Sequence, residues 1–200
     1  MRTLVLMGSP RRHGNTAALL EPFCDELRRG GDRLETEWLY DRNIQPCVAC
    51  RSCQEDWTDF HCSRRDDGQV LFDRVLDSDL IVLATPIYAW YCTAPMKALL
   101  DRLVYGMNKY YGARKGPALW AGKAMVLLMT CGYPPEKGCD LFEAGMRRYC
   151  KHSQLRYLGS HTERHPGYDV PFMDGEKEVR TRTFARELLQ KFQEDSAAGA

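Results

Sequence analysis

Short apolar runs alternate with amphipathic stretches along the whole chain. Residues 80–84 and 124–129 are continuously apolar, which is typical of central parallel strands buried on both faces. Residues 2–7 form a third run and predict the first strand, which opens the chain. Residues 34–40 alternate between apolar and polar, so they predict a half-exposed strand near a sheet edge, and 156–161 predict the last strand.

Helical spacing of apolar side chains lies between these predicted strands. One helix follows residue 16 and ends at Gly30 and Gly31, and later helices begin after Asp67 and Thr93. Two further helices precede and follow the last predicted strand. Strands that alternate with helices predict an α/β fold with a doubly wound, five-stranded parallel sheet. We expect a single domain over residues 1–195, a cysteine-rich insertion at about 43–65 after the second strand, and a disordered tail at 196–200.

Composition narrows the class of protein without naming a function. The 200 residues are 44% hydrophobic and 28% charged, as in soluble globular proteins. A net charge of +1 gives no reason to expect nucleic acid or a membrane surface as a partner. The apolar runs are too short to span a bilayer and no signal peptide precedes the first strand, so we expect a cytoplasmic protein. The nine cysteines are then expected to be thiols, metal ligands or redox groups.

Three loops follow the predicted strands at their carboxyl ends, where parallel sheets bind ligands: residues 8–16, 85–91 and 130–135. The first combines glycine, hydroxyl and cationic residues before a helix start, which favours an anion site. Asn15 or Thr16 is expected to cap the helix, and Arg11 to add a charge-assisted bond to a phosphate. The alternative is an ordinary turn that binds nothing.

Motif spacing and the other two loops narrow the kind of phosphate-containing ligand that the first loop can bind. The first loop lacks the Gly-Lys-Ser/Thr of a Walker A motif, and its glycines do not fit the dinucleotide fingerprint. A hydroxyl-rich loop with modest positive charge suits a phosphate monoester. Tyr88 and Trp90 in the second loop can pack on a flat heterocycle, and Gly132 in the third lets the backbone approach a ligand edge.

Together these motifs resemble the NADPH-dependent FMN reductase family of flavodoxin-like proteins over about residues 1–160. The residues that carry the resemblance are Gly8-Ser9-Pro10-Arg11-x-x-Gly14-Asn15-Thr16, Thr85-Pro86-Ile87-Tyr88, Pro95-Met96-Lys97-x-Leu99-x-Asp101-Arg102 and Gly122-Lys123 leading to Thr130-x-Gly132. The resemblance implies strand order 2-1-3-4-5 and FMN as cofactor. It places the FMN phosphate on Ser9, Arg11, Asn15 and Thr16, and the flavin ring against Pro86, Ile87, Tyr88, Thr130 and Gly132, beside Trp90.

For chemistry, the resemblance implies that NAD(P)H delivers hydride to the flavin, which then passes electrons to a quinone, flavin or similar acceptor. No catalytic side chain is required, and none is assigned. The resemblance also implies a homodimer or homotetramer. Tyr105, Tyr110, Tyr111 and Trp120 are candidates for a subunit surface, and ordinary core and loop aromatics are the alternative. Cys131, within the third loop, either approaches the flavin or is a small residue tolerated there.

A second candidate site lies in the insertion. Cys47, Cys50, Cys53 and Cys62 have the spacing C-x2-C-x2-C-x8-C, which favours a cubane iron–sulfur cluster. Structural zinc more often uses two separated C-x2-C pairs, so zinc is the weaker alternative. Free thiols or a reversible disulfide, such as Cys50 with Cys53, remain open. The motif resembles that of the iron–sulfur flavoproteins, with a longer final spacing. The corresponding functions are an electron carrier between FMN, a [4Fe–4S] cluster and protein partners, or a redox sensor.

Overall fold

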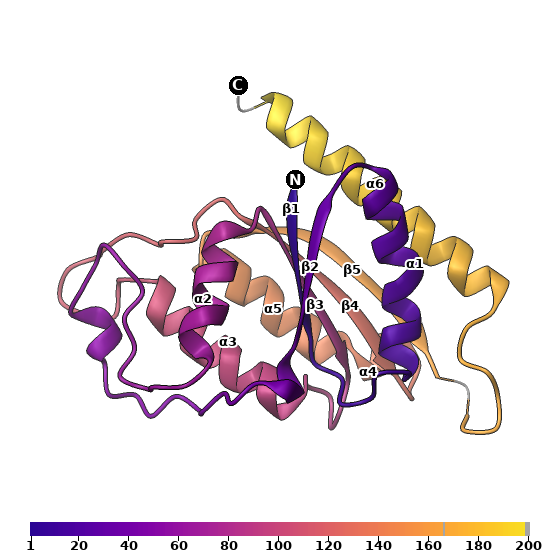
Figure 1. Ribbon diagram of the computed structural model, residues 1–200, viewed down its shortest axis with the longest axis horizontal. Helices are drawn as coiled ribbons and strands as arrows, with labels where there is room; N and C mark the ends of the chain where they lie inside the picture. Colours follow the sequence, from indigo (N-terminus) through magenta and orange to yellow (C-terminus); the bar gives the residue numbers. More distant parts are fainter. Residues whose placement is uncertain (166, 199–200) are drawn as a thin grey trace.

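The computed structural model describes residues 1–165 and 167–198. Its centre is one five-stranded sheet, all parallel, in the order β2-β1-β3-β4-β5 (Figure 1). The strands are β1 (Arg2–Met7), β2 (Arg33–Trp38), β3 (Leu80–Pro86), β4 (Ala124–Cys131) and β5 (Arg156–Arg164). The predicted doubly wound sheet and its flavodoxin-like strand order are confirmed.

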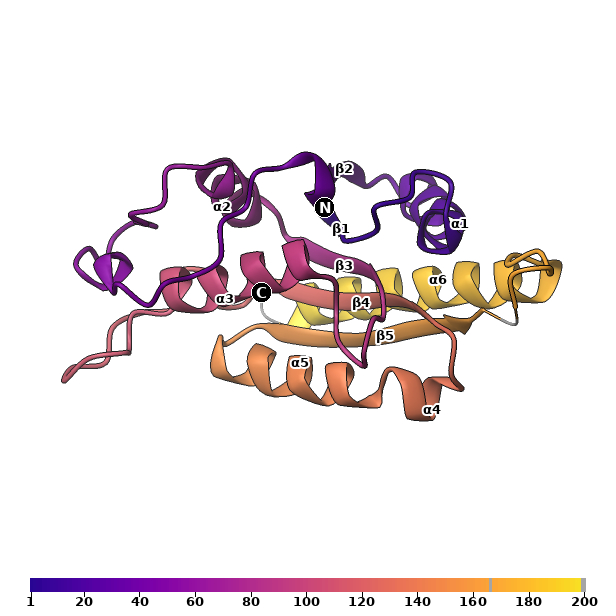
Figure 2. The ribbon, with the colours of Figure 1, turned by 90° about the horizontal axis from the view of Figure 1, so that it is seen from below.

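Six helices in the described ranges cover the two faces of the sheet. They are α1 (Asn15–Arg29), α2 (Gly68–Asp77), α3 (Ala94–Met107), α4 (Pro135–Gly138), α5 (Asp140–His152) and α6 (Gly175–Ala198). Helices α1 and α6 pack together on one face, and α2, α3 and α5 cover the other, as the turned view shows (Figure 2). Within the described ranges, no helix is both long and apolar enough to cross a membrane.

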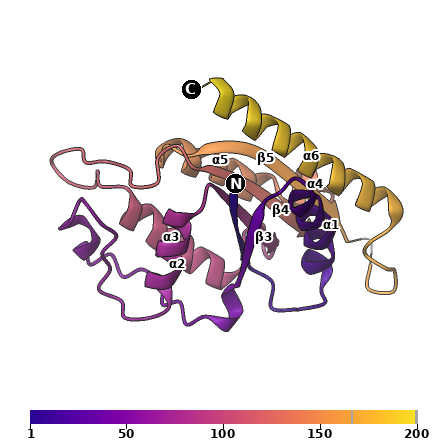
Figure 3. The same ribbon diagram turned by 45° about the horizontal axis from the view of Figure 1, so that its top comes forward.

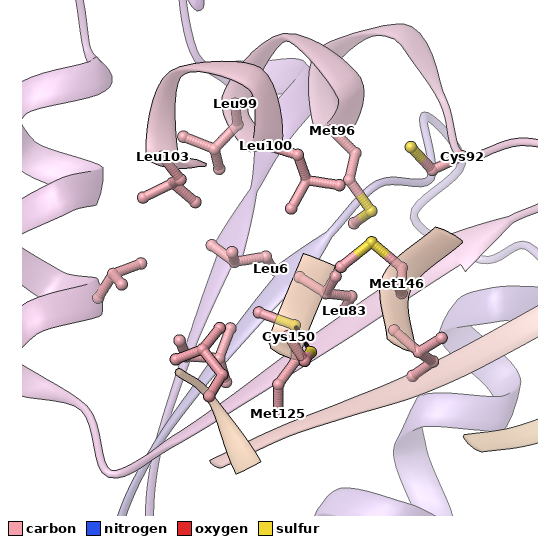
Figure 4. Packing of buried hydrophobic residues seen from close by; sticks show 14 of the residues in the cluster. Leu6, Leu83, Cys92, Met96, Leu99, Leu100, Leu103, Met125, Met146 and Cys150 are labelled. Carbon is pink, nitrogen blue, oxygen red and sulfur yellow. Dashed lines mark hydrogen bonds between the residues drawn. The ribbon is translucent and has the colours of Figure 1, made fainter. Parts of the chain in front are cut away.

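The face below α3 and α5 holds a sulfur-rich apolar core (Figure 4). Met96 of α3 and Met146 of α5 point toward one another above the strands. The thiol of Cys150 donates to Met125 Sδ at 3.6 Å. Leu83, on the central strand β3, is fully buried beneath them. Burying each such side chain stabilises the fold by about 1.5–3 kcal/mol, so this layer holds α3 and α5 against the sheet.

The edges of two predicted elements differ from the structure. The strand predicted at 34–40 ends at Trp38, because the chain turns into a short 3₁₀ helix at Leu39–Asp41 and buries Leu39 in the core. The tail predicted as disordered at 196–200 is helical as far as Ala198, since α6 contains no glycine or proline beyond Gly175. Residues 199–200 lie outside the described residues.

The insertion between β2 and α2 is mostly irregular, with one short 3₁₀ helix at Ser52–Gln54. It lies beside the connection 108–123 at the end of the molecule away from α1 and α6 (Figures 1 and 3). Phe60 anchors it, because its ring is buried against Phe72 of α2. Gly106 of α3 leaves room for that ring, which fills the space a Cβ there would need. The insertion therefore shares the main core.

Candidate functional site

The first loop, residues 8–16, is held against the carboxyl end of the sheet by hydrogen bonds. Gly8 N–H donates to the carbonyl of Ala84 at 2.7 Å, which holds the loop against β3. Ser9 is buried, and its Oγ accepts the N–H of Arg11 at 3.2 Å. Gly14 is the N-cap of α1, and no side chain caps the helix. The expected capping by Asn15 or Thr16 is wrong, because both residues already lie inside the first turn.

That first turn of α1 nevertheless supplies donors at the carboxyl edge of the sheet. Helix geometry leaves the N–H groups of Asn15, Thr16 and Ala17 without an acceptor inside the helix. The buried hydroxyl of Thr16 instead bonds Thr130 Oγ1 at 2.8 Å. The structure therefore brings the first and third predicted loops into direct contact across 114 positions of sequence.

Neighbouring arginines in the first loop have different roles. Arg12 pairs with Asp41 and lies over the ring of Trp38, with its Cζ 4.1 Å from the ring centroid. Arg11 is exposed, and within the described part of the chain it forms no ion pair. Arg11 therefore stays the candidate cation of this loop for an anion.

The second loop is a tight hairpin at the end of β3. Tyr88 and Tyr91 exchange backbone hydrogen bonds of 2.9 and 3.0 Å. Between them, Ala89 and Trp90 have φ values of 48° and 66°, a left-handed conformation that costs free energy for residues with a Cβ. The hairpin presents the exposed side chains of Tyr88 and Trp90 at the sheet edge.

Trp90 also joins the second loop to the third. Its indole Nε1 donates to the carbonyl of Lys137 at 3.0 Å, and its ring stacks on Tyr133 with the centroids 6.0 Å apart. Between the loops lies a hollow of about 290 Å³, which we call the aromatic hollow. Its lining residues are Ile87, Ala89, Trp90, Cys131, Gly132, Tyr133 and Gly138.

Three of the six predicted ring-binding residues line this hollow, namely Ile87, Trp90 and Gly132, and the other three, Pro86, Tyr88 and Thr130, do not. Pro86, the last residue of β3, pairs in register with Thr130 of β4. Tyr133 and Gly138 also line the hollow, and neither is among the predicted ring-binding residues. The signal available for Tyr133 was its position in the predicted loop 130–135, whereas Gly138 depends on how α4 folds back.

All four cysteines of the insertion line a second cavity, of about 270 Å³, which we call the cysteine pocket. The backbone wraps around it with left-handed Ala49 and Arg51, at φ 54° and 67°. Among the described residues, no three His, Cys, Asp or Glu side chains form a group suited to one metal ion. Thiolates that bind a cubane each ligate a different iron atom, so they need not converge on one point.

Buried cations and hydroxyl groups surround these thiols. Arg102 Nη2 lies 3.5 Å from Cys62 Sγ. Lys109 is fully buried, with its Nζ donating to the carbonyl oxygens of Cys53 and Asp59 at 2.6 and 3.0 Å. This arrangement supplies positive charge where thiolates would carry negative charge.

The thiols of Cys50 and Cys53 differ in acidity. Hydrogen bonds from the hydroxyls of Ser52 and Ser63 lower the pKa of Cys50 to about 7. Burial raises the pKa of Cys53. Cys50 is therefore the thiol of this pair that is more readily present as a thiolate near neutral pH.

The predicted aromatic subunit surface is not one surface. Trp120 is fully buried, and its Nε1 donates to Asn108 Oδ1 at 2.9 Å, so it belongs to the core. Tyr105 and Tyr111 line the cysteine pocket, with ring centroids 4.4 Å apart. The sequence could not separate these roles, because both kinds of aromatic residue occur in the same glycine-rich connection.

The sequence of this chain matches a known protein family and several curated relatives. The model of the NADPH-dependent FMN reductase family matches residues 1–136. An iron–sulfur flavoprotein of Archaeoglobus fulgidus is 31% identical over 136 residues, covering 68% of this chain and 58% of that protein. One from Methanocaldococcus jannaschii is 30% identical over 102 residues, covering 51% of each chain. The chain thus spans between half and two thirds of these relatives' length.

Solved structures share the fold at low identity. The NAD(P)H:quinone oxidoreductase from Methanothermobacter marburgensis superposes with a TM-score of 0.62 at 22% identity, over 94% of this chain and 96% of that one. At this identity the likeness establishes the fold alone. The family match extends from β1 into α4 and includes the first loop, the hairpin and the edge of the aromatic hollow. The chain belongs to the NADPH-dependent FMN reductase family.

Proposed function

We propose that this protein is a flavin-dependent oxidoreductase, which binds FMN and passes electrons from NAD(P)H to a quinone, flavin or similar acceptor. The observation that carries the proposal is the meeting of three loops at one sheet edge in a member of this family. The loop 8–14 and the first turn of α1 offer an anion site, and the aromatic hollow adjoins the same strand ends.

The residues present fit a phosphate monoester. Asn15 and Thr16 present unpaired helix N–H groups, and the exposed Arg11 is free to form charge-assisted bonds. Ser9 holds the loop in shape through Arg11 N–H. A dianion there would satisfy donors that the fold leaves without an acceptor.

The residues around the hollow fit a flat ring. Ile87 and Trp90 offer apolar and aromatic surface, and Gly132 has nothing within 4 Å of the position of a Cβ, so the backbone is open to a ligand. FMN, when bound, supplies the hydride-accepting chemistry. The protein's part is to bind the phosphate, position the ring and exclude water. No catalytic side chain is assigned.

Arg11→Ala tests the phosphate loop, with Arg12→Ala as the matched control. FMN affinity, measured by quenching of flavin fluorescence, should fall about tenfold or more in Arg11→Ala, because a charge-assisted bond contributes about 1.5–3 kcal/mol. Arg12→Ala should retain most of the affinity, since Arg12 is already paired with Asp41. Equal losses in the two variants, or no loss in either, would contradict the assignment of Arg11.

The electron donor is tested by anaerobic stopped-flow mixing. Bleaching of the bound flavin by NADPH or NADH supports the reductase proposal and identifies the preferred nicotinamide. A flavin that stays oxidised with both donors refutes direct reduction by a nicotinamide. Turnover with a series of quinones and free flavins then identifies the acceptor class.

A second candidate function is that of an iron–sulfur flavoprotein, in which electrons pass between FMN, a [4Fe–4S] cluster and protein partners. The cysteine pocket favours it, because Cys47, Cys50, Cys53 and Cys62 line one cavity beside two buried cations. Those four thiolates would hold the cluster. Arg102 and Lys109 would offset the negative charge of the thiolates.

Anaerobic reconstitution with iron and sulfide separates the alternatives for this pocket. Four irons and four sulfides per chain, lost in Cys62→Ser and retained in Cys92→Ser, support the cluster. Cys92 is the control because it is buried in the main core. Bound zinc without sulfide supports the zinc alternative, and alkylation of all four cysteines after reconstitution supports free thiols.

The proposal also covers the oligomeric state of the protein and its place in the cell. We propose a homodimer or homotetramer in the cytoplasm, with no nucleic-acid or membrane partner. The support is the family's implied assembly, the near-neutral net charge of +1 and the cysteine-rich composition. Sedimentation velocity measures the oligomeric state, and a monomer at all concentrations would contradict it.

A further inference from the structure

Two cysteines outside the insertion lie in contact beside the aromatic hollow. Cys131 is the last residue of β4, and Cys139 is the N-cap of α5. Their side chains are hydrogen-bonded to each other, and the residues are 5% and 2% exposed. The backbone next to Cys139 packs on Cys131, because a Cβ at Gly138 would lie 3.3 Å from Cys131 Sγ.

The two thiols differ in access. Cys131 lines the aromatic hollow, whereas Cys139 does not. Cys131 Sγ also donates to the carbonyl of Tyr133 at 3.1 Å, which holds its side chain at the loop that borders the hollow. A molecule that enters the hollow therefore meets Cys131 and not Cys139.

Their acidity agrees with this order. The hydrogen bond from Cys139 lowers the pKa of Cys131, and the charge of Arg164 acts in the same direction against burial and Glu136. The hydrogen bond to Cys131, together with burial, raises the pKa of Cys139. By contrast, burial raises the pKa of Cys24 to about 12, as for other core thiols that have no such partner.

We propose that Cys131 and Cys139 form a reversible dithiol–disulfide pair that exchanges with small-molecule disulfides through the aromatic hollow. Cys131, as thiolate, attacks one sulfur of the small disulfide and releases one thiol, which leaves a mixed disulfide on Cys131. Cys139 then loses its proton and attacks Cys131 Sγ, and the second thiol leaves. Two protein thiols are oxidised, one small disulfide is reduced to two thiols, and the two protons pass to those products.

This inference uses none of the cysteines of the insertion, but its entry path is the same aromatic hollow in which we propose the flavin ring, so FMN and the small disulfide compete for it. A closed bond would link β4 to the start of α5 and fix the segment 132–138, which supplies Gly132 and Tyr133 to the hollow. The site is thus a second redox centre at the wall of the proposed flavin site.

Tryptic peptide mapping in glutathione buffers tests the pair directly in the full-length protein. Trypsin cleaves after Lys123, Lys137 and Arg147, so Cys131 and Cys139 fall on separate peptides, 124–137 and 138–147. After denaturation and alkylation, a disulfide appears as those two peptides linked. Halving reduced glutathione at constant oxidised glutathione should raise the ratio of linked to alkylated peptides about fourfold, as an intramolecular bond requires. A twofold rise, the law for a mixed disulfide, would overturn the proposal.

Variants assign the order of attack. Cys139→Ser should trap glutathione on peptide 124–137, whereas Cys131→Ser should trap none on peptide 138–147. Cys150→Ser is the matched control, since Cys150 is buried in the core against Met125, and it should keep the linked pair. Circular dichroism checks that each variant is folded, and the wild-type titration stands without them. Full alkylation of both wild-type peptides in oxidising buffer would also overturn the proposal.

Discussion

Replacing Arg102 with methionine removes one half of the buried ion pair that holds the insertion to α3. Arg102 Nη1 contacts both carboxylate oxygens of Asp66 at 2.7 and 2.9 Å, and the two side chains are 1% and 0% exposed. Asp66 also accepts the backbone N–H groups of Gln45 and Gly68 at 2.8 and 2.9 Å. Arg102→Met therefore strands a buried carboxylate at the junction of the insertion, α2 and α3.

The expected loss in the free energy of unfolding depends on which partners Asp66 keeps in the variant. Removing one partner of a buried pair costs about 3–5 kcal/mol, because the other charge stays buried. The two N–H groups on Asp66 persist in the variant, so we expect the lower end, about 3 kcal/mol in the free energy of unfolding. That is about two powers of ten in the unfolding equilibrium constant.

The pH dependence has a definite sign. Burial alone would raise the pKa of Asp66, but the bond from Arg102 and the N–H groups of Gln45 and Gly68 hold it below its usual value. In the wild type, this stabilisation is complete above about pH 4 and is lost as the pH falls through the lowered pKa. In Arg102→Met the cation that lowers this pKa is gone and burial still raises it, so the part of the acid destabilisation that comes from Asp66 should become smaller or reverse its sign.

Urea unfolding, followed by tryptophan fluorescence, measures the loss, and limited trypsin digestion at Arg64 and Arg65 reports opening of the insertion. Lys97→Met is the matched control, because Lys97 pairs with Asp101 on the same helix at 2.7 Å but in solvent. Such exposed pairs contribute about 0.3–0.5 kcal/mol. If Arg102→Met costs no more than Lys97→Met, the buried pair does not anchor the insertion.

Three further changes test other parts of the fold. Gly106→Ala places a methyl group in the space of the Phe60 ring and should cost about 1–3 kcal/mol in urea unfolding. Thr16→Val leaves the Thr130 hydroxyl buried without its bond and should cost about 1–3 kcal/mol in the same assay. Burial lowers the pKa of His161, so the unfolded chain binds more protons there. Stability should therefore fall as the pH drops below about 6.5, less steeply in His161→Gln.

Each of these changes has a control on the chain. Gly112→Ala adds a methyl group with nothing within 4 Å and should be nearly neutral, so equal costs at Gly106 and Gly112 would contradict the clash. Thr16→Ser keeps the hydroxyl and should recover most of the stability lost in Thr16→Val. An unchanged acid slope in His161→Gln would show that this histidine is not the group being titrated.

The sheet was predictable because its signal is local and strong. The runs 80–84 and 124–129 form β3 and β4, since full burial on both faces demands continuous apolar sequence. Their ends were too short in the prediction, because Thr85 and Thr130 continue the ladder although they are polar. The loops that carry the candidate site then follow from topology, since parallel strands end at the same edge.

Contacts between residues far apart in the chain could not be predicted from the sequence. The bond between Thr16 and Thr130 exists because α1 begins beside the end of β4, and neither threonine carries a local signal for it. Lys109 is a lysine in a polar segment, yet the carbonyl oxygens of Cys53 and Asp59 allow its complete burial. Such positions depend on what the fold brings to them.

The anchoring of the insertion by Phe60 limits how this segment can be exchanged between proteins. Its ring fills space left by Gly106 and packs on Phe72, two positions that lie outside the insertion. A graft of residues 43–65 into a relative therefore has to bring a glycine on α3 and an aromatic residue on α2 with it. Without these two residues, Phe60 would have no site to pack in, and the cysteines would lie on a loop that is not anchored to the core.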